Sequence, residues 1–342
     1  MPPQRLASVP DDQRQRLEPT AAMVGASIEI DLLDATRAPT VDEAPVGRGM
    51  LLVQLSLFST DPGYDAIRPG EPYLMTQAGG WRRFDLQRYG FGSRTYGELS
   101  TALSHDGRRV ALADPSGLAV VDLRDGTFRR FDLPVHHAVA LQWTADRSVL
   151  LLKDRHSGRR PCGPKGCALD LTTGELTTVP YDLFRTTHDA AGRAVEVRAG
   201  ANTRPAQVVI HQEEPGATTV DLPFRTSPST AGGPVAAEHV AYSQCPHARR
   251  PRDPGGVVVV DPVSGDFIAM LANEQGEGCL GAQAWLTDRH LLVDHWESGS
   301  IWLWDISGGR PRQVASSRTT GIHVAVARGL VVDRLRRHLH NR

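Results

Sequence analysis

The sequence contains very little lysine. Lys153 and Lys165 are the only lysines among its 342 residues, so arginine supplies almost all of the positive charge. Lysine and arginine together number 38 and aspartate and glutamate 39, which leaves a formal net charge of −1. A neutral total excludes a general electrostatic attraction to nucleic acids or to anionic membranes. We therefore expect no specific nucleic-acid partner.

Long apolar runs are absent as well. No stretch approaches the roughly 18 consecutive apolar residues of a membrane-spanning helix, and the N-terminus lacks the basic start and apolar core of a secretion signal. We expect no membrane span and, for the sequence as written, a cytoplasmic protein. An extracytoplasmic location is the alternative if the start is truncated.

Several catalytic motifs are missing too. The chain has no convincing G-x-S-x-G elbow, Walker loop, H-E-x-x-H pair or dinucleotide fingerprint. Its 13 histidines do not recur at a regular interval, as a ring of metal ligands around a repeating fold would require. We expect no metal or other cofactor, with Mg²⁺ or Ca²⁺ as the alternative if the protein is an enzyme.

What recurs is a turn of the form Asp-x-x-x-Gly after a strand rich in valine or leucine. It starts at Asp122, Asp170, Asp261 and Asp305, with gaps of 48, 91 and 44 residues, and the middle gap corresponds to two units. A second series of hairpin turns interleaves with the first, at residues 104–107, 145–147, 189–192 and 287–289. Two phased series of strand-joining turns are typical of a β-propeller, with one four-stranded sheet per repeat.

The repeats predict an all-β fold with six blades, and seven is the alternative count. We place the blades at residues 48–95, 97–133, 137–180, 184–224, 234–271 and 280–316. The strand at 323–332 is expected to complete the first blade by pairing with N-terminal strands, which closes the propeller and removes its open edges. The predicted domains are a flexible N-terminal segment with a possible rim strand (1–47), the propeller (48–332) and a basic C-terminal tail (333–342).

Two segments resemble known propeller families. Residues 300–305 (SIWLWD) end in the Trp-Asp pair of WD40 repeats, and residues 103–131 resemble the S-x-D-G blade core of WD40, TolB-like and YVTN propellers. There is one Trp-Asp and no Gly-His start to each repeat, so the chain is WD40-like. It also resembles actinobacterial propellers that often lie outside the membrane behind an anchor, although no anchor is expected from the sequence as written. The resemblance implies a binding scaffold more than a reaction.

Unusual residues gather in the loops between the second and third strands of the blades and in the connections between blades. In a propeller these segments emerge on one face, and long loops on a rigid scaffold commonly carry binding sites. The alternative is that their charges are merely solvated. The predicted binding residues are Arg155, Arg159, Arg160, Arg204, His247, Arg249, Arg250 and Trp296, with Lys153, Lys165 and Arg252 adding to the positive charge.

The four cysteines fall in the same set of segments. Cys162 and Cys167 flank a Gly-Pro-Lys-Gly turn that can bring them within disulfide range, and Cys245 and Cys279 form the other candidate pair. Free thiols remain an alternative. A four-cysteine zinc site is less consistent with the spacing, because only the first pair approaches the separation that such sites use.

The preferred interpretation is a monomeric, non-catalytic propeller scaffold that binds a protein or an anionic ligand through its loop face. The alternative is a propeller lyase, cyclase or hydrolase with an acid–base group in the axial cleft. Its catalytic candidates are His188, His247, His295 and Glu297.

Overall fold

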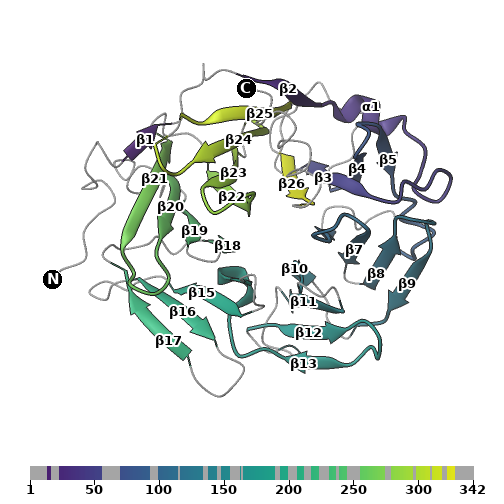
Figure 1. Cartoon of the computed structure of the whole chain (residues 1–342). Helices are drawn as coiled ribbons and strands as arrows, with labels where there is room; N and C mark the ends of the chain where they lie inside the picture. The colour runs from purple at the N-terminus through teal and green to yellow at the C-terminus, as the bar shows by residue number, and fades with distance from the viewer. Residues whose placement is uncertain are drawn as a thin grey trace. The chain divides into compact units, whose positions relative to one another are not determined.

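The structure is a computed structural model of the chain. It describes residues 14–16, 23–55, 70–92, 99–114, 116–133, 138–144, 148–154, 162, 165–188, 193–198, 206–211, 217–222, 231–235, 239–244, 255–273, 279–295, 298–308, 310–317 and 322–327. Within these ranges almost every element is a β-strand. The strands form six sheets, which are the blades of a β-propeller (Figure 1).

By its internal contacts the chain divides into two units, Glu29–Leu183 with Ser317–Arg342, and Met1–Ile28 with Phe184–Ser316. The former unit holds three blades. In spatial order, the first blade contains β26 (Ile322–Val326), β3 (Gly49–Leu55), β4 (Pro72–Thr76) and β5 (Trp81–Arg83). The second blade contains β6 (Ser100–Leu103), β7 (Arg109–Asp114), β8 (Gly117–Asp122) and β9 (Phe128–Phe131). The third blade contains β10 (Ala138–Trp143), β11 (Val149–Asp154), β12 (Cys167–Asp170) and β13 (Leu176–Thr178).

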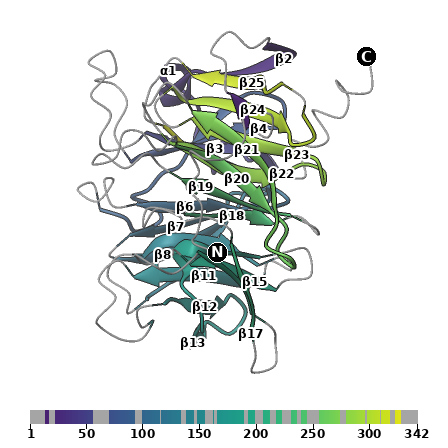
Figure 2. The same cartoon turned by 90° about the vertical axis from the view of Figure 1, so that its left-hand side faces the viewer.

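The other unit holds the remaining three blades. The fourth blade contains β14 (Thr186–His188), β15 (Ala194–Arg198), β16 (Gln207–His211) and β17 (Ala217–Asp221). The fifth blade contains β18 (Ala231–Val235), β19 (Val240–Gln244), β20 (Gly255–Val260) and β21 (Phe267–Asn273). The sixth blade contains β22 (Leu280–Trp285), β23 (His290–His295), β24 (Ser300–Asp305) and β25 (Arg312–Ser317). Neighbouring strands within each blade are antiparallel, as in the pairing of β11 with β12 and of β12 with β13. Figure 2 shows these three strands one below the other.

The last strand confirms the predicted closure of the first blade. β26 pairs antiparallel with β3, with Ile322 opposite Leu55 and Val326 opposite Leu51. Both strands are apolar, and the described side chains of β3 are almost all buried. This pairing covers the inner edge of β3 and makes β26 the innermost strand of the blade. The six-blade count is therefore confirmed.

The blades hold together because their central strands are apolar on both faces. In β20, the run from Val257 to Val260 is fully buried. Alternate residues face opposite sides of a sheet, so a strand between two neighbouring blades must be apolar at every position. Val257 and Val259 belong to the cluster that includes Trp285 of the sixth blade, whereas Val258 and Val260 belong to the cluster of the fourth and fifth blades.

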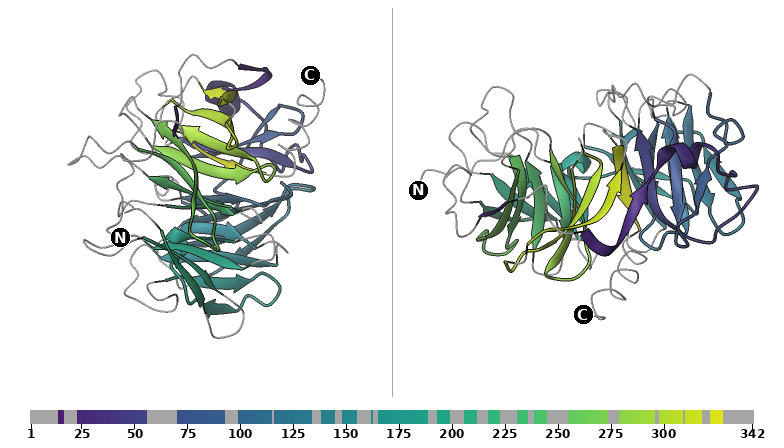
Figure 3. Two further views of the ribbon diagram at one scale, coloured as in Figure 1. Left: turned by 60° about the vertical axis from the view of Figure 1, so that its left-hand side comes forward. Right: turned by 90° about the horizontal axis from the view of Figure 1, so that it is seen from above.

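N-terminal residues add strands to the outside of two blades. β2 (Met23–Ile30) lies next to β25, as Figures 1 and 3 show, and β1 (Arg14–Arg16) pairs in parallel with β21. The short helix α1 (Leu32–Thr36) follows β2, and the Asp31 side chain caps it by accepting hydrogen bonds from the amides of Leu33 and Asp34. The limits of the predicted domains remain predictions.

Each blade has two edges where its strands turn. The first and second strands and the third and fourth strands are joined by turns at one edge, here called the hairpin edge. The opposite edge carries the link between the second and third strands and the connection to the next blade, and is here called the loop edge. The recurring Asp-x-x-x-Gly turns therefore all lie at hairpin edges, since they follow β8, β12, β20 and β24.

Candidate functional site

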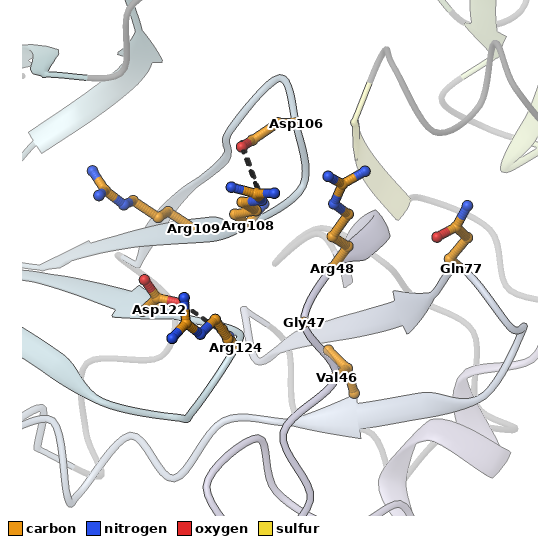
Figure 4. Close-up of a pocket in the computed structure, with 9 residues that line it drawn as sticks. All are labelled: Val46, Gly47, Arg48, Gln77, Asp106, Arg108, Arg109, Asp122 and Arg124. Atoms are coloured by element: carbon orange, nitrogen blue, oxygen red, sulfur yellow. Dashed lines mark hydrogen bonds and ion pairs between the residues drawn. The ribbon is translucent and has the colours of Figure 1, made fainter.

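The hairpin edges of the first and second blades enclose a pocket of about 730 Å³ (Figure 4). Both blades belong to the same unit, so the pocket is described within that unit alone. Its polar lining is dominated by arginine. The lining residues are Val46, Gly47, Arg48, Gln77, Asp106, Arg108, Arg109, Asp122 and Arg124, here called the arginine groove.

The first wall of the arginine groove is the turn between β6 and β7. Ser104 organises this turn, because its Oγ accepts hydrogen bonds from the amides of Arg108 at 3.1 Å and Arg109 at 2.9 Å. Gly107 has a φ of 69°, a left-handed conformation that glycine adopts without steric cost. The local sequence therefore presents two consecutive arginines at the end of a well-defined hairpin.

The second wall is the turn between β8 and β9. The Asp122 carboxylate caps it by accepting a hydrogen bond from the Arg124 amide at 2.9 Å, and the Gly126 amide donates to the Asp122 carbonyl, also at 2.9 Å. The Leu123 amide donates to the carbonyl of Arg108 at 2.9 Å. This last bond ties the two turns of the second blade to each other.

The third wall is the segment that enters β3. The amides of Val46 and Gly47 both donate to the Leu123 carbonyl, at 3.0 and 2.8 Å, and the Gly49 amide donates to the Gly107 carbonyl at 2.7 Å. Arg48 is thus held between residues that are bonded to both turns of the second blade. Figure 4 shows Arg48 and Gln77 on one side of the groove and Arg108 and Arg124 on the other. Backbone bonds therefore position the arginines before any ligand arrives.

The groove carries an excess of positive charge. Four arginines against two aspartates leave a net charge of +2 in its lining. Arg108 lies 3.6 Å from Asp106, and its side chain is 56% exposed. Among the described residues, Arg48 and Arg124 have exposed side chains that form no ion pair and no side-chain hydrogen bond. Their guanidinium donors are therefore available to an anion.

The two carboxylates already serve the turns on which they lie. Asp106 Oδ1 accepts hydrogen bonds from the Ser104 hydroxyl at 2.8 Å and from the Arg108 amide at 3.2 Å. One oxygen of Asp122 accepts the Arg124 amide. These are turn-capping bonds, which aspartate makes in any hairpin of this type. They do not neutralise the guanidinium groups of Arg48 and Arg124.

Other blades repeat the scaffold but not its unpaired arginines. The backbone carbonyl of Arg108 accepts the Leu123 amide, and the same bond is made by Ser148 in the third blade and by Arg289 in the sixth. These three residues are therefore structurally equivalent. In the sixth blade, the Arg289 guanidinium bonds to Asp305 at 3.2 Å and also to Ser307, within its own blade. The sixth-blade turn has Ser307 where the second blade has Arg124, so it lacks the unpaired arginine.

Most of the predicted loop-edge residues lie outside the described residues. This applies to Arg155, Arg159, Arg160, Arg204, Cys245, His247, Arg249, Arg250, Arg252, Trp296 and Glu297. The predicted binding face therefore stays a prediction. The arginine groove lies at the hairpin edges, so it is a separate site from the loop face.

Two of the catalytic candidates are described, and they lie in different blades. His188 ends β14, opposite Ala194 of β15. His295 ends β23, where its Nδ1 accepts the Ser298 amide at 3.1 Å and its Nε2 lies 3.2 Å from the Asn273 side-chain amide. Both ring nitrogens of His295 therefore have partners within the sheet region. Within the described ranges, no three His, Cys, Asp or Glu side chains are arranged to hold a metal ion.

One predicted disulfide is confirmed. Cys162 and Cys167 are bonded, with their Cα atoms 4.8 Å apart, and both are buried in the cluster that includes Trp143 and Leu152. Gly166 between them adopts a φ of 136° and packs against Leu183, where a Cβ would lie 2.4 Å from a side-chain carbon. Cys279 is also disulfide-bonded. A free thiol at Cys162 or Cys167 is thereby excluded.

The sequence analysis did not identify the residues of the arginine groove. A usable signal was present in the repeats, because Arg124 occupies the turn position held by Thr172 in the third blade and Ser307 in the sixth. Superposing the repeats would have shown an excess of arginine in one blade. The contribution of Arg48 has no such signal, since it depends on how two blades pack together.

Comparisons with known proteins yielded structural similarity only. No family model matches the chain, and no curated protein matches it by sequence. The chain is similar in structure to the β-propeller domain of the trilobed protease from Pyrococcus furiosus, with 12% identity, a TM-score of 0.45 and coverage of 72% of this chain and 77% of that one.

It is also similar to TolB from Acinetobacter baumannii, with 15% identity, a TM-score of 0.43 and coverage of 78% of this chain and 67% of that one. A third similar structure is hydrazine synthase from Kuenenia stuttgartiensis, with 12% identity, a TM-score of 0.45 and coverage of 65% of this chain and 67% of that one. No helix in the described ranges is long and apolar enough to cross a membrane.

Proposed function

We propose that this protein is a monomeric, non-catalytic binding propeller and that its arginine groove takes an anionic group of a partner. The observation that supports this most is the pair of exposed guanidiniums of Arg48 and Arg124, which have no partner among the described residues and face a pocket of about 730 Å³. Arginine is well suited to such a role, because its planar fork of donors matches the geometry of carboxylate and phosphate groups.

The rigid frame of the groove strengthens the proposal. Binding is more favourable when the recognising groups are already in place, because less side-chain and loop freedom is lost. Here the backbone hydrogen bonds of Val46, Gly47 and Gly49 to the second blade fix the positions from which the arginines project. The WD40-like and TolB-like assignment agrees with a scaffold role and remains a prediction.

The test uses a fluorescein-labelled oligoglutamate peptide and fluorescence anisotropy at low salt. The double variant Arg48→Gln, Arg124→Gln should weaken binding about tenfold, since it removes charge-assisted hydrogen bonds without removing bulk. The matched control is Arg289→Gln, because Arg289 is the sixth-blade equivalent of Arg108, does not line the arginine groove, and its guanidinium is already bonded to Asp305. Added salt should weaken binding to the wild-type protein and have a smaller effect on the double variant.

An unchanged affinity in the double variant would overturn the proposal for this groove. The loop face predicted from the sequence would then be the place to look. A variant with Arg159, Arg160, Arg249 and Arg250 replaced by serine provides that comparison in the same assay. Loss of oligoglutamate binding in the loop variant, but not in the groove variant, would assign the anion site to the loop face.

A further inference from the structure

A second pocket lies on the other side of the second blade. It has a volume of about 300 Å³ and lies between the second and third blades, still within one unit. Its lining is more apolar than that of the arginine groove and includes Val120, Phe128, Phe131 and Leu171. We call it the apolar groove.

The two grooves meet at the hairpin edge of the second blade. Arg109 and Asp122 line both of them, and these residues are direct partners in the pairing of β7 with β8. A ligand that fills both grooves must therefore cross the edge of this blade. Its anionic part would face Arg48 and Arg124, and its apolar part would face Phe128 and Leu171.

The apolar groove contains an exposed aromatic side chain, that of Phe128. Phe128 is 37% exposed and is one of two large hydrophobic residues that are exposed among the described residues. On its buried side it packs edge-on against Tyr89, with ring centroids 5.0 Å apart. Exposed aromatic rings with a fixed orientation are typical anchors of binding surfaces.

The Arg129 side chain, which lines this second groove, is engaged by neighbouring residues. The Arg129 guanidinium lies over the Phe131 ring at 4.6 Å, and its Nη1 donates to the carbonyl oxygens of Leu171 and Thr172. Nη1 is thus directed into the third blade, and the planar face of the guanidinium covers an aromatic ring. The apolar groove is therefore chemically distinct from the arginine groove, although the two are continuous.

We propose that the occupant is an extended segment of a partner protein that carries an acidic side chain and, a few residues away, a large apolar one. This proposal rests on the proposed function, because the acidic side chain would occupy the arginine groove. The apolar side chain would pack against Phe128 and Leu171. Asp122 lies where the grooves meet, and the carboxylate oxygen that does not cap the turn can accept an amide N–H of the crossing segment.

The same carboxylate argues against a nucleic acid as the occupant. A phosphate backbone offers acceptors but no donor for the Asp122 oxygen that does not cap the turn, and it brings a negative charge with every nucleotide. A net charge of +2 in the arginine groove also matches one or two carboxylates better than a continuous row of phosphates. A peptide supplies both the donor for Asp122 and the apolar side chain for Phe128.

The test compares labelled peptides in anisotropy titrations with the full-length protein. One peptide set carries two glutamates followed, after a spacer of varied length, by leucine. A second set has serine in place of the leucine, and a third has glutamine in place of both glutamates. The leucine peptide with the best spacer should bind about tenfold more tightly than its serine counterpart, as expected for burial of one large apolar side chain.

Protein variants locate the effect. Phe128→Ser should weaken the leucine peptide about tenfold and leave the serine peptide unchanged. The matched control is Val263→Ser, since Val263 is the other large exposed hydrophobic residue of the described part of the chain and lines neither groove. Circular dichroism checks that Phe128→Ser is folded. The leucine-to-serine change in the peptide tests the same apolar contact without altering the protein.

The outcomes separate the two proposals. Equal binding of the leucine and serine peptides, with both weakened by Arg48→Gln and Arg124→Gln, would overturn the extended peptide site and retain the arginine groove. Failure of every acidic peptide to bind would overturn the proposed function itself. Displacement of the leucine peptide by a single-stranded oligonucleotide of higher affinity would show that the occupant is a nucleic acid and would overturn the peptide proposal.

Discussion

The backbone amide of Gly49 donates a hydrogen bond to the carbonyl oxygen of Gly107 at 2.7 Å. These residues belong to different blades, and each adjoins an arginine of the groove, Arg48 and Arg108. The contact thus joins two turns that are distant in sequence and places their guanidinium groups around one pocket. The stability of this junction and the capacity of the groove to bind an anion should depend on the same residues.

The close approach of Gly126 to Asp42 predicts unequal costs for two similar glycine substitutions. Gly126 and Gly174 end equivalent Asp-x-x-x-Gly turns with φ values of 72° and 80°. A Cβ at Gly174 would meet nothing within 4 Å, whereas one at Gly126 would lie 2.8 Å from the Asp42 Cα. Gly174→Ala should cost about 1–2 kcal/mol through backbone strain, and Gly126→Ala about 1–3 kcal/mol more through crowding. Urea denaturation measures the free energy of unfolding of both variants. Equal losses would mean that the segment at Asp42 moves away and relieves the crowding.

A second prediction concerns the tryptophan between the second and third blades. Trp143 is 4% exposed, and its Nε1 donates to the Ala102 carbonyl at 3.2 Å. Trp302 is equally buried, but its Nε1 is without a hydrogen-bond partner among the described residues. Trp143→Phe should therefore destabilise the protein by about 1 kcal/mol more than Trp302→Phe, because only the former loses a hydrogen bond. Thermal denaturation of the two variants tests this, and a larger loss at Trp302 would contradict it.

The Cys162–Cys167 bond should contribute measurably to stability. It closes a short loop, with a sequence separation of 5. Loss of such a cross-link increases the freedom of the unfolded chain, and Cys162→Ala with Cys167→Ala should lower the free energy of unfolding by about 2 kcal/mol. Urea denaturation under non-reducing conditions measures the change.

A chemical control establishes that the bond forms in solution. Alkylation of the denatured, unreduced protein, followed by peptide mass spectrometry, should find Cys162 and Cys167 linked and unmodified. Alkylated Cys162 and Cys167 in the purified, non-reduced protein would show that the bond is absent there, and the expected loss of stability in the double variant would no longer apply.

The capped turns predict a loss of stability in acid. Hydrogen bonds from the amides of Ser264 and Val263 hold the pKa of Asp261 below its ordinary value. A lowered pKa in the folded state means that the carboxylate stabilises the fold above the unfolded pKa of about 4, and that this contribution disappears as the pH falls through the folded pKa.

Asp261→Asn isolates this effect, because asparagine can still cap the turn but carries no charge. The variant should be less stable than the wild-type protein at pH 6, and the difference should shrink as the pH is lowered below about 4. Thermal denaturation over this pH range tests the expectation. A difference that does not change with pH would show that the turn is insensitive to the charge of Asp261.

Local chemistry made the fold predictable from the sequence. The Asp-x-x-x-Gly turns are specified by residues within one turn: the aspartate at 122, 170, 261 or 305 caps amides two or three residues later, and the glycine supplies the positive φ where it is described. Such turns form wherever their residues occur, so their spacing revealed the period of the blades. The disulfide was predictable for the same reason, since Cys162 and Cys167 are separated by one short turn.

The arginine groove was decided only by the tertiary structure. Arg48 belongs to a segment with no repeat signature, and nothing in its neighbourhood along the chain indicates that it lies opposite Arg108 and Arg124. Their proximity results from the packing of two apolar blades and from the backbone bonds of Val46, Gly47 and Gly49 to the next blade. Turns are encoded by contacts between near neighbours in sequence. A site shared by two blades depends on contacts between residues that only the folded chain brings together.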